Sequence, residues 1–149
     1  MVQRGDPAAP TDPKLVVRRL IEEVMNAGDL DAIDELYTPR MAAAARRWIA
    51  PFLNAFPDTR MEIVELIAEN DTVVGRFRCS GTHLGPWRGR PPTGRRFERV
   101  DEVYIYRVRD GRISEAWGIE DNRSRERQLG LGGESHRSIA AAPRRPPAP

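Results

Sequence analysis

Apolar side chains in the first third of the chain recur at helical intervals. After Pro13 they stand three and four positions apart, at Val16, Val17, Leu20, Ile21, Val24 and Met25. This spacing predicts an amphipathic helix. Thr11 or Asp12 is a suitable N-cap for it, and the segment 26–28 (Asn-Ala-Gly) ends it.

Two further helices are expected before residue 57. Asp29 is a suitable cap for a short helix that carries Leu30, Ile33, Leu36 and Tyr37. A third helix begins after Pro39 and runs through an alanine-rich stretch, 41–50. Because proline lacks a backbone N–H, we expect Pro51 to kink or end this helix.

From residue 60 onward the pattern changes to one typical of strands. We predict strands over 61–68, 73–83, 96–109 and 112–120, with a turn at 69–72 and a loop at 84–95. Asp110-Gly111 is a strong hairpin signal, and a short helix over 122–129 follows the last strand. Helices followed by hairpin-linked strands predict an α+β fold, with helices on one face of an antiparallel sheet. Such a sheet curves, and the hollow between sheet and helices is where a small molecule would bind.

The length of 149 residues and the apolar content of 40% suit one domain with a real core. We place that domain at 13–131, between a disordered N-terminus (1–12) and a disordered tail rich in proline and arginine (132–149). Neither a membrane span nor a signal peptide is recognisable, so we expect a cytoplasmic protein that does not bind membranes.

Strand alternation predicts which side chains share a face. In the second strand Phe77 and His83 lie on one face, and Arg76 and Arg78 on the other. In the last strand Trp117 and Asp121 are expected to face the same way, and Glu120 the opposite way. Asp101 and Glu102 are adjacent in mid-strand, so one of them must point inward or into an interface. Arg76 or Arg78 is a possible partner for that acid.

Composition narrows the chemistry. A single cysteine, Cys79, and two histidines, His83 and His136, argue against a metal site. The net charge is only +2, and few stacking aromatic residues accompany the arginines. We therefore expect no nucleic-acid partner.

The motifs "GTHLG" (81–85), "PPTGRR" (91–96) and "RVRDGRISEAWG" (107–118) occur in an order and spacing that resembles the SnoaL-like polyketide and ester cyclases. That family has the nuclear transport factor 2-like fold, and the similarity covers roughly Lys14 to Leu131. The resemblance implies a cone-shaped domain with an apolar pocket, no cofactor and a homodimer. It also implies that an acid removes an activated C–H proton and that the enolate closes a ring by aldol attack. The acid matches Asp121, and the histidine of the first motif matches His83.

The residues suit these roles. A carboxylate beside Trp117 loses solvation, which makes Asp121 a stronger base, and His83 can donate a hydrogen bond to a developing oxyanion. However, Asp121 precedes a predicted helix, so it is equally suited to act as an N-cap, and both roles stay open. Glu120 is expected to be solvated or paired with the nearby arginines.

We expect the pocket to be lined by Trp117, Tyr104, Phe77, Trp87, Asp101 and Glu102. The aromatic members are alternatively core residues, and Trp87 is alternatively a lid or part of a subunit interface. The substrate is expected to be small and hydrophobic or aromatic. The leading hypothesis is therefore a cofactor-independent cyclase or isomerase.

Two other functions stay open from the sequence. The first is a non-catalytic small-molecule-binding or dimerisation module of the same fold. The second is hydrolysis of an epoxide or ester, for which Asp101, Asp121 and Arg76 or Arg78 would converge on a water molecule.

Overall fold

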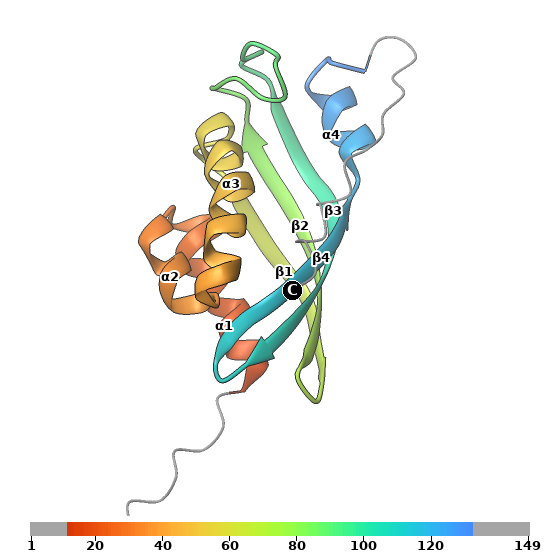
Figure 1. Cartoon of the computed structure of the whole chain (residues 1–149). Coiled ribbons are helices and arrows are strands. Elements are labelled where there is room, and N and C mark those ends of the chain that lie inside the picture. Colours follow the sequence, from red (N-terminus) through yellow and green to blue (C-terminus); the bar gives the residue numbers. More distant parts are fainter. Residues whose placement is uncertain (1–11, 133–149) are drawn as a thin grey trace, which may run out of the picture.

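The structure, a computed structural model, describes residues 12–132 (Figure 1). The predicted disordered segments lie outside this range, apart from Asp12 and Gly132. The chain forms, in order, α1 (Pro13–Arg19), the π-helix η1 (Leu20–Asn26), the short 3-10 helix η2 (Leu30–Ala32), α2 (Ile33–Leu36), α3 (Pro39–Ala55), β1 (Arg60–Glu69), β2 (Thr72–Thr82), β3 (Arg96–Arg109), β4 (Arg112–Glu120) and α4 (Asn122–Gln128).

Side-chain caps start the N-terminal helices where the sequence predicts them. The Asp12 carboxylate accepts a hydrogen bond from the backbone N of Lys14 (2.9 Å), and Asp29 accepts one from the backbone N of Asp31 (3.1 Å). The helix α3 continues through Pro51 to Ala55, so the proline does not end it. One helical turn remains after the proline, and it places apolar side chains over the sheet.

The four strands pair antiparallel in chain order, β1-β2-β3-β4. Figure 1 shows α1, α2 and α3 on one face of a curved sheet, with α4 following the end of β4. Burial alternates along β2 with a period of two, so the face carrying Phe77 and Cys79 meets the helices and the face carrying Arg76 and Arg78 does not. The predicted α+β fold, with helices on one face of a curved antiparallel sheet, is confirmed.

Bulges shift the pairing register in three strands, β1, β3 and β4. In β4 the pairs Arg107–Glu115 and Val108–Ile113 leave Ser114 as an extra residue. Such an insertion reverses the alternation. Ile113 and Ala116 therefore both face the helices, whereas Trp117 is 38% exposed on the opposite face. The predicted orientation of Trp117 toward the hollow was wrong for this reason.

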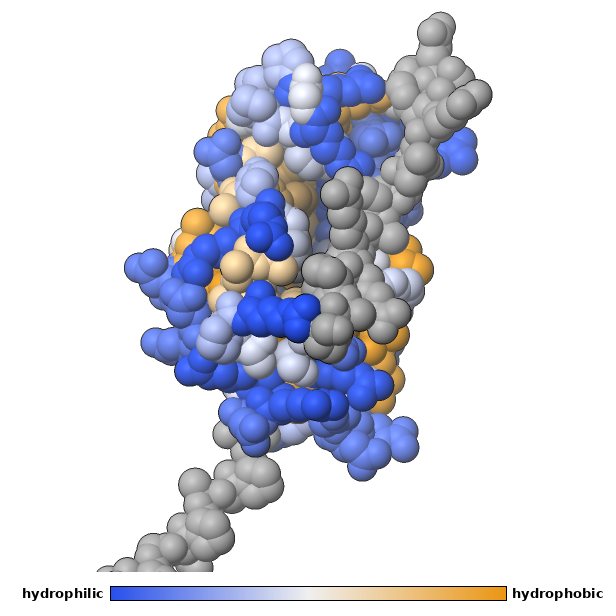
Figure 2. Space-filling model, in the orientation of Figure 1, coloured by the Kyte–Doolittle hydropathy of each residue, from blue (hydrophilic) through white to orange (hydrophobic). Residues whose placement is uncertain are grey.

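The sheet face away from the helices carries a band of exposed apolar side chains. Cross-strand pairing places Ile105 beside Trp117 and Val103 beside Ile119. Ile67 extends the row through Val74 on β2. We call Ile67, Val103, Ile105, Trp117 and Ile119 the outer band. Orange surface lies along the right-hand edge of Figure 2, on the side where β3 and β4 lie in Figure 1.

Candidate functional site

Two glutamates meet on the helix-covered face of the sheet. Glu102 on β3 and Glu120 on β4 are direct cross-strand partners. Arg125 from α4 forms an ion pair with each of them, through Nη2 to Glu102 Oε1 (2.5 Å) and through Nη1 to Glu120 Oε2 (3.4 Å). The side chains are 0% exposed for Arg125, 3% for Glu102 and 16% for Glu120. Glu120 is thus the acid through which the group meets solvent.

Hydrogen bonds extend this group. The Tyr104 hydroxyl donates to Glu120 Oε1 at 2.6 Å, and Arg125 Nη1 donates to Asn122 Oδ1 at 2.6 Å. We call Glu102, Tyr104, Glu120, Asn122 and Arg125 the acid cluster. The two glutamates are held side by side by the β3–β4 pairing, and both contact Arg125 of α4. The secondary structure therefore sets the positions of the charged groups.

Aromatic rings enclose the acid cluster. Trp48 from α3 stacks on the Tyr104 ring, with 6.2 Å between ring centroids. The Arg125 guanidinium lies over Phe97 (4.8 Å) and Phe52 (5.3 Å), at distances typical of cation–π contacts. These rings exclude water from the cluster, which strengthens the electrostatic interactions inside it.

The chain reversal after β4 brings Arg125 into place. The backbone N of Asp121 donates to the Asp101 carbonyl (3.0 Å), which extends the β3–β4 pairing by one residue. The Asp121 side chain then accepts a hydrogen bond from the backbone N of Ser124 (3.0 Å), which starts α4. Because α4 begins there, Asn122, Arg125 and Leu129 fall on the buried side of the helix.

Burial and charge set the protonation of the cluster. Burial, and after it the negative charge of Glu120, raise the pKa of Glu102 to about 8, although the positive charge of Arg125 opposes both effects. Burial alone would lower the pKa of Arg125, but the charges of Glu102 and Glu120 raise it above its ordinary value. Near neutral pH Glu102 therefore favours its protonated form, beside the carboxylate of Glu120 and the guanidinium of Arg125. Such a pair contains both a general acid and a general base.

Asp121 lies outside the acid cluster. Its side chain is exposed and caps α4, as the capping alternative predicts. Asp101 also faces outward, where one carboxylate oxygen lies 3.8 Å from both Arg76 and Arg78. Of the two adjacent acids in β3, Glu102 is the one that points inward. The hydrolysis hypothesis required Asp101, Asp121 and Arg76 or Arg78 to lie together. Asp101 does lie near both arginines, but Asp121 caps α4 instead.

His83 is buried at the opposite end of the sheet from the hairpins. Its Nδ1 accepts a hydrogen bond from the backbone N of Thr93 (3.2 Å), so its proton resides on Nε2 in the neutral form. Burial lowers the pKa of His83, which favours that neutral form. Its ring packs against Phe56 and Trp87, with ring centroids 5.4 and 6.4 Å away. The contacts connect His83 to Arg125 through the rings of Phe56 and Phe97.

The remaining predicted lining residues divide between core and surface. Trp87 is buried against Phe56 (5.4 Å), with the Arg88 guanidinium over its ring (4.7 Å). Phe77 is fully buried and contacts the Tyr104 ring at 6.3 Å. Of the predicted set, Tyr104 and Glu102 belong to the acid cluster, and Phe77 packs against the Tyr104 ring.

Sequence reasoning missed Arg125, Asn122 and Trp48. The first two could have been found from the helical period, because residues 122, 125 and 129 share one side of the predicted helix. An arginine on a buried side of a helix requires an acid partner. Glu120 was predicted to be solvated or paired with the nearby arginines, and it is paired with Arg125. Its inward direction was missed because the bulge at Ser114 reverses the alternation of β4.

Two negative findings concern residues 12–132 alone. Within that range no three His, Cys, Asp or Glu side chains are arranged to hold a metal ion. None of the helices formed by these residues is long and apolar enough to cross a membrane.

The fold and the site together define a small α+β domain in which the acid cluster lies between the sheet and the helices. A model of the SnoaL-like polyketide cyclase family matches residues 15–129. The chain belongs to the SnoaL-like polyketide cyclase family.

Two similar proteins are named for a cyclase activity. The aklanonic acid methyl ester cyclase DnrD of Streptomyces peucetius is 31% identical over 108 residues, which cover 72% of each chain. The aklanonic acid methyl ester cyclase DauD of a second Streptomyces is 29% identical over 115 residues, covering 77% of this chain and 70% of DauD.

Solved structures give the same fold. AclR from Streptomyces galilaeus, a proposed hydroxylase, superposes with a TM-score of 0.72 at 26% identity, covering 82% of this chain and 98% of AclR. IdmH from Streptomyces antibioticus, a proposed polyketide cyclase, superposes with a TM-score of 0.68 at 30% identity, covering 80% of this chain and 99% of IdmH. The chain is thus similar to proteins of one fold that carry names for different reactions.

Proposed function

We propose that the protein is a cofactor-independent cyclase or isomerase of a small polyketide-type substrate, in which Glu102 and Glu120 move the proton. The observation that carries this proposal is the cross-strand pair of glutamates, Glu102 and Glu120, that meets on the helix-covered face of the sheet and is held by a single arginine, Arg125. The names of DnrD and DauD support aklanonic acid methyl ester as the first substrate to test.

The reaction follows from the position of each group. Glu120, the more exposed acid, is the base that removes a proton from the carbon beside a substrate carbonyl. The resulting enolate carbon attacks a second carbonyl of the same molecule, which forms a carbon–carbon bond and an alkoxide. Glu102 holds the proton of the pair and returns it to that alkoxide, so the product is an isomer of the substrate. Arg125, which forms an ion pair with both glutamates, balances their negative charge throughout the reaction.

The family resemblance assigns the acid role to Asp121 and a supporting role to His83, and both stay proposals. The test compares Glu120→Gln with Asp121→Asn in an assay of aklanonic acid methyl ester cyclisation. Loss of general base catalysis costs about 10²–10⁴-fold in kcat, and we expect that loss for Glu120→Gln only. Circular dichroism checks that both variants fold. A loss confined to Asp121→Asn would return the acid role to Asp121.

Hydrolysis of an epoxide or ester is the second candidate. It is favoured by one observation: two carboxylates and an arginine do converge, although they are Glu102, Glu120 and Arg125. A carboxylate and its protonated partner can activate water and protonate the leaving oxygen. Turnover in ¹⁸O-labelled water distinguishes the two reactions, because hydrolysis incorporates the label and cyclisation does not. If neither reaction occurs, the non-catalytic binding module becomes the better hypothesis.

We also propose that two copies of the chain associate through the outer band, and that the protein acts in the cytoplasm. Support comes from the large apolar side chains that cross-strand pairing gathers on the face away from the helices. An exposed apolar surface of this kind is typical of an interface. Sedimentation analysis of Ile105→Lys tests the association: we expect monomers, whereas an unchanged mass would exclude this face.

A further inference from the structure

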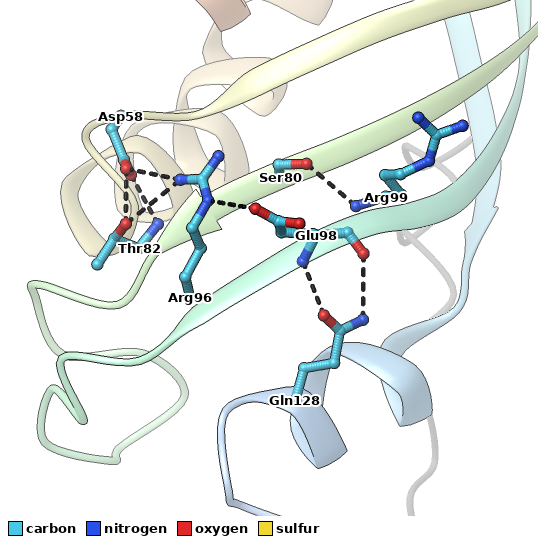
Figure 3. Close-up of polar contacts among 7 residues, drawn as sticks. All are labelled: Asp58, Ser80, Thr82, Arg96, Glu98, Arg99 and Gln128. Atoms are coloured by element: carbon cyan, nitrogen blue, oxygen red, sulfur yellow. Dashed lines mark hydrogen bonds and ion pairs between the residues drawn. The ribbon is translucent and has the colours of Figure 1, made fainter.

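A second polar site lies on the outer face of the sheet, away from the acid cluster. It is a groove of about 380 Å³ whose lining residues are Arg60, Glu62, Arg78, Ser80, Arg96, Glu98 and Arg99. They come from the ends of β1, β2 and β3 nearest the loop 83–95. Figure 3 shows part of this groove together with Asp58, Thr82 and Gln128, which border it.

One row of side chains in this groove, formed by Arg60, Ser80 and Arg99, contains two arginines without an acid partner in the described part of the chain. Arg60 on β1 is the cross-strand partner of Ser80 on β2. On the other side of Ser80, its Oγ accepts a hydrogen bond from the backbone N of Arg99 (3.0 Å). Neither guanidinium, of Arg60 or of Arg99, has a hydrogen bond or ion pair with another residue in the range 12–132. In Figure 3 the Arg99 side chain extends along the sheet, and no dashed line reaches its guanidinium from the other residues drawn.

The rows on both sides contain their own acid partners. Arg96 bonds to Asp58 (3.0 Å) and to Glu98 (3.1 Å). Arg78 lies opposite Glu62 in the β1–β2 pairing and 3.8 Å from Asp101. Arg96 and Arg78 therefore each have an acid within 4 Å, whereas the guanidiniums of Arg60 and Arg99 have none among residues 12–132. The positive charge available to a ligand is that of Arg60 and Arg99, with the Ser80 hydroxyl between them.

The backbone at Arg99 is strained in a way that serves this arrangement. Arg99 has φ 53°, in the left-handed region. It is the extra residue of a bulge in β3, between the pairs Cys79–Val100 and Gly81–Phe97. A non-glycine residue in that region costs roughly 1–2 kcal/mol and persists where the surroundings require it. The bulge turns both Glu98 and Arg99 to the outer face, and Gln128 holds Glu98 through backbone bonds of 2.8 and 3.2 Å.

We propose that the Arg60–Ser80–Arg99 row binds the phosphate group of a soluble phosphate monoester. Two guanidiniums match the two negative charges of such a group, and they donate hydrogen bonds in forked pairs. A hydroxyl between them can donate to a third oxygen. A tetrahedral anion offers three free oxygens, whereas a carboxylate offers two and a single charge.

The test measures binding of inorganic phosphate, glycerol 3-phosphate and succinate to the full chain by NMR titration. We expect saturable shifts of the Ser80 and Arg99 amides, with glycerol 3-phosphate and phosphate both binding more tightly than succinate. Arg60→Gln and Arg99→Gln should each weaken binding about tenfold, since each removes a charge-assisted contact. Arg47→Gln, which removes one exposed arginine from α3, is the matched control and should leave binding unchanged.

Three results would overturn the proposal. Shifts that do not saturate, or an equal weakening by Arg47→Gln, would mean that only the overall charge attracts the anion. Tighter binding of succinate would replace the phosphate with a dicarboxylate. Binding to vesicles that contain phosphatidic acid, without binding to glycerol 3-phosphate, would replace the soluble monoester with a lipid surface.

A further variant separates ligand binding from folding. Glycine adopts the left-handed region without strain, so Arg99→Gly keeps the bulge and removes the guanidinium. We expect this variant to unfold at a higher denaturant concentration than the wild type and to bind phosphate at least tenfold more weakly. A variant that is more stable and binds phosphate normally would show that the row does not hold the anion.

Discussion

Two pairs of acids, adjacent in the sequence, lie on opposite faces of the same two strands. Glu102 and Glu120 face the helices, whereas Asp101 and Asp121 face outward. Both pairs bridge β3 and β4, the first as cross-strand partners and the second through a backbone hydrogen bond. A shift of one residue along a strand therefore separates a candidate catalytic pair from ordinary surface acids.

The difference between the two pairs is one of environment. Asp101 is 59% exposed and meets Arg76 and Arg78 at 3.8 Å, so water screens the attraction. Exposed ion pairs of this kind contribute about 0–1 kcal/mol to stability. Inside, Arg125 and Glu102 are almost fully buried. A buried charge that loses its partner is far more costly than an exposed one.

Removal of Arg125 is the largest expected perturbation. Arg125→Met leaves the negative charge of the Glu102–Glu120 pair without a counter-charge, and we expect a loss of about 3–5 kcal/mol of unfolding free energy. Urea denaturation monitored by tryptophan fluorescence measures this loss of unfolding free energy. Arg78→Met, on the outer face, is the matched control and should change stability by less than about 1 kcal/mol.

Equal losses in these two variants would contradict the comparison. A neutral Arg125→Met would mean that the two glutamates take up protons at little cost. The variant Arg125→Met combined with Glu120→Gln distinguishes these cases, because it removes the negative charge that lost its partner and should recover part of the loss.

Protonation of the inner pair should make stability depend on pH. The folded-state pKa of Glu102 is about 8, above the value of about 4.3 in an unfolded chain, so its contribution is complete below about pH 4 and is lost as the pH rises to 8. The expected slope is at most about 1.4 kcal/mol per pH unit, for one proton released on unfolding.

The measurement is the difference in unfolding free energy between the wild type and Glu102→Gln, from pH 5 to pH 8. Taking the difference matters because the lowered pKa of His83 gives a slope of the opposite sign, with stability lost at acid pH. A difference that does not vary with pH would mean that Glu102 is ionised in the folded protein.

Most of the fold followed from local patterns in the sequence. Asp12 and Asp29 were recognisable as caps, and Asp110-Gly111 as a hairpin turn, because their chemistry acts over a few residues. The extra residue Ser114 left no such local signal. Its position depends on how β3 and β4 pair, and it decides whether Trp117 or Glu120 points inward.

The site was harder to predict for the same reason. Glu102 was identified because one of two adjacent acids in a strand had to face inward. Arg125 and Trp48 reach the cluster from α4 and α3, which are distant in sequence from β3. Their convergence depends on the tertiary arrangement, and no spacing in the sequence specifies it.

The role of Asp121 offers a prediction of intermediate size. Asp121→Ala removes the N-cap of α4 and should cost about 1 kcal/mol of unfolding free energy, whereas Asp121→Asn keeps a capping oxygen and should be nearly neutral. Thermal unfolding of the two variants gives the comparison. If both variants lost the same stability, the negative charge would matter more than the cap.

Asp101 completes the comparison with the smallest expected effect. Asp101→Asn removes an exposed charge near Arg76 and Arg78 and leaves no buried group without a partner. We therefore expect a loss of no more than about 0.5 kcal/mol of unfolding free energy, which should diminish as salt screens these ion pairs. The stability change caused by Glu102→Gln, one residue away, should vary strongly with pH and little with salt, because the buried pair is shielded from ions. Urea denaturation of both variants at low and high ionic strength measures this contrast. If Asp101→Asn were the more damaging of the two, the outward-facing acid would belong to an interface that buries it, and association through the outer band would be the place to look.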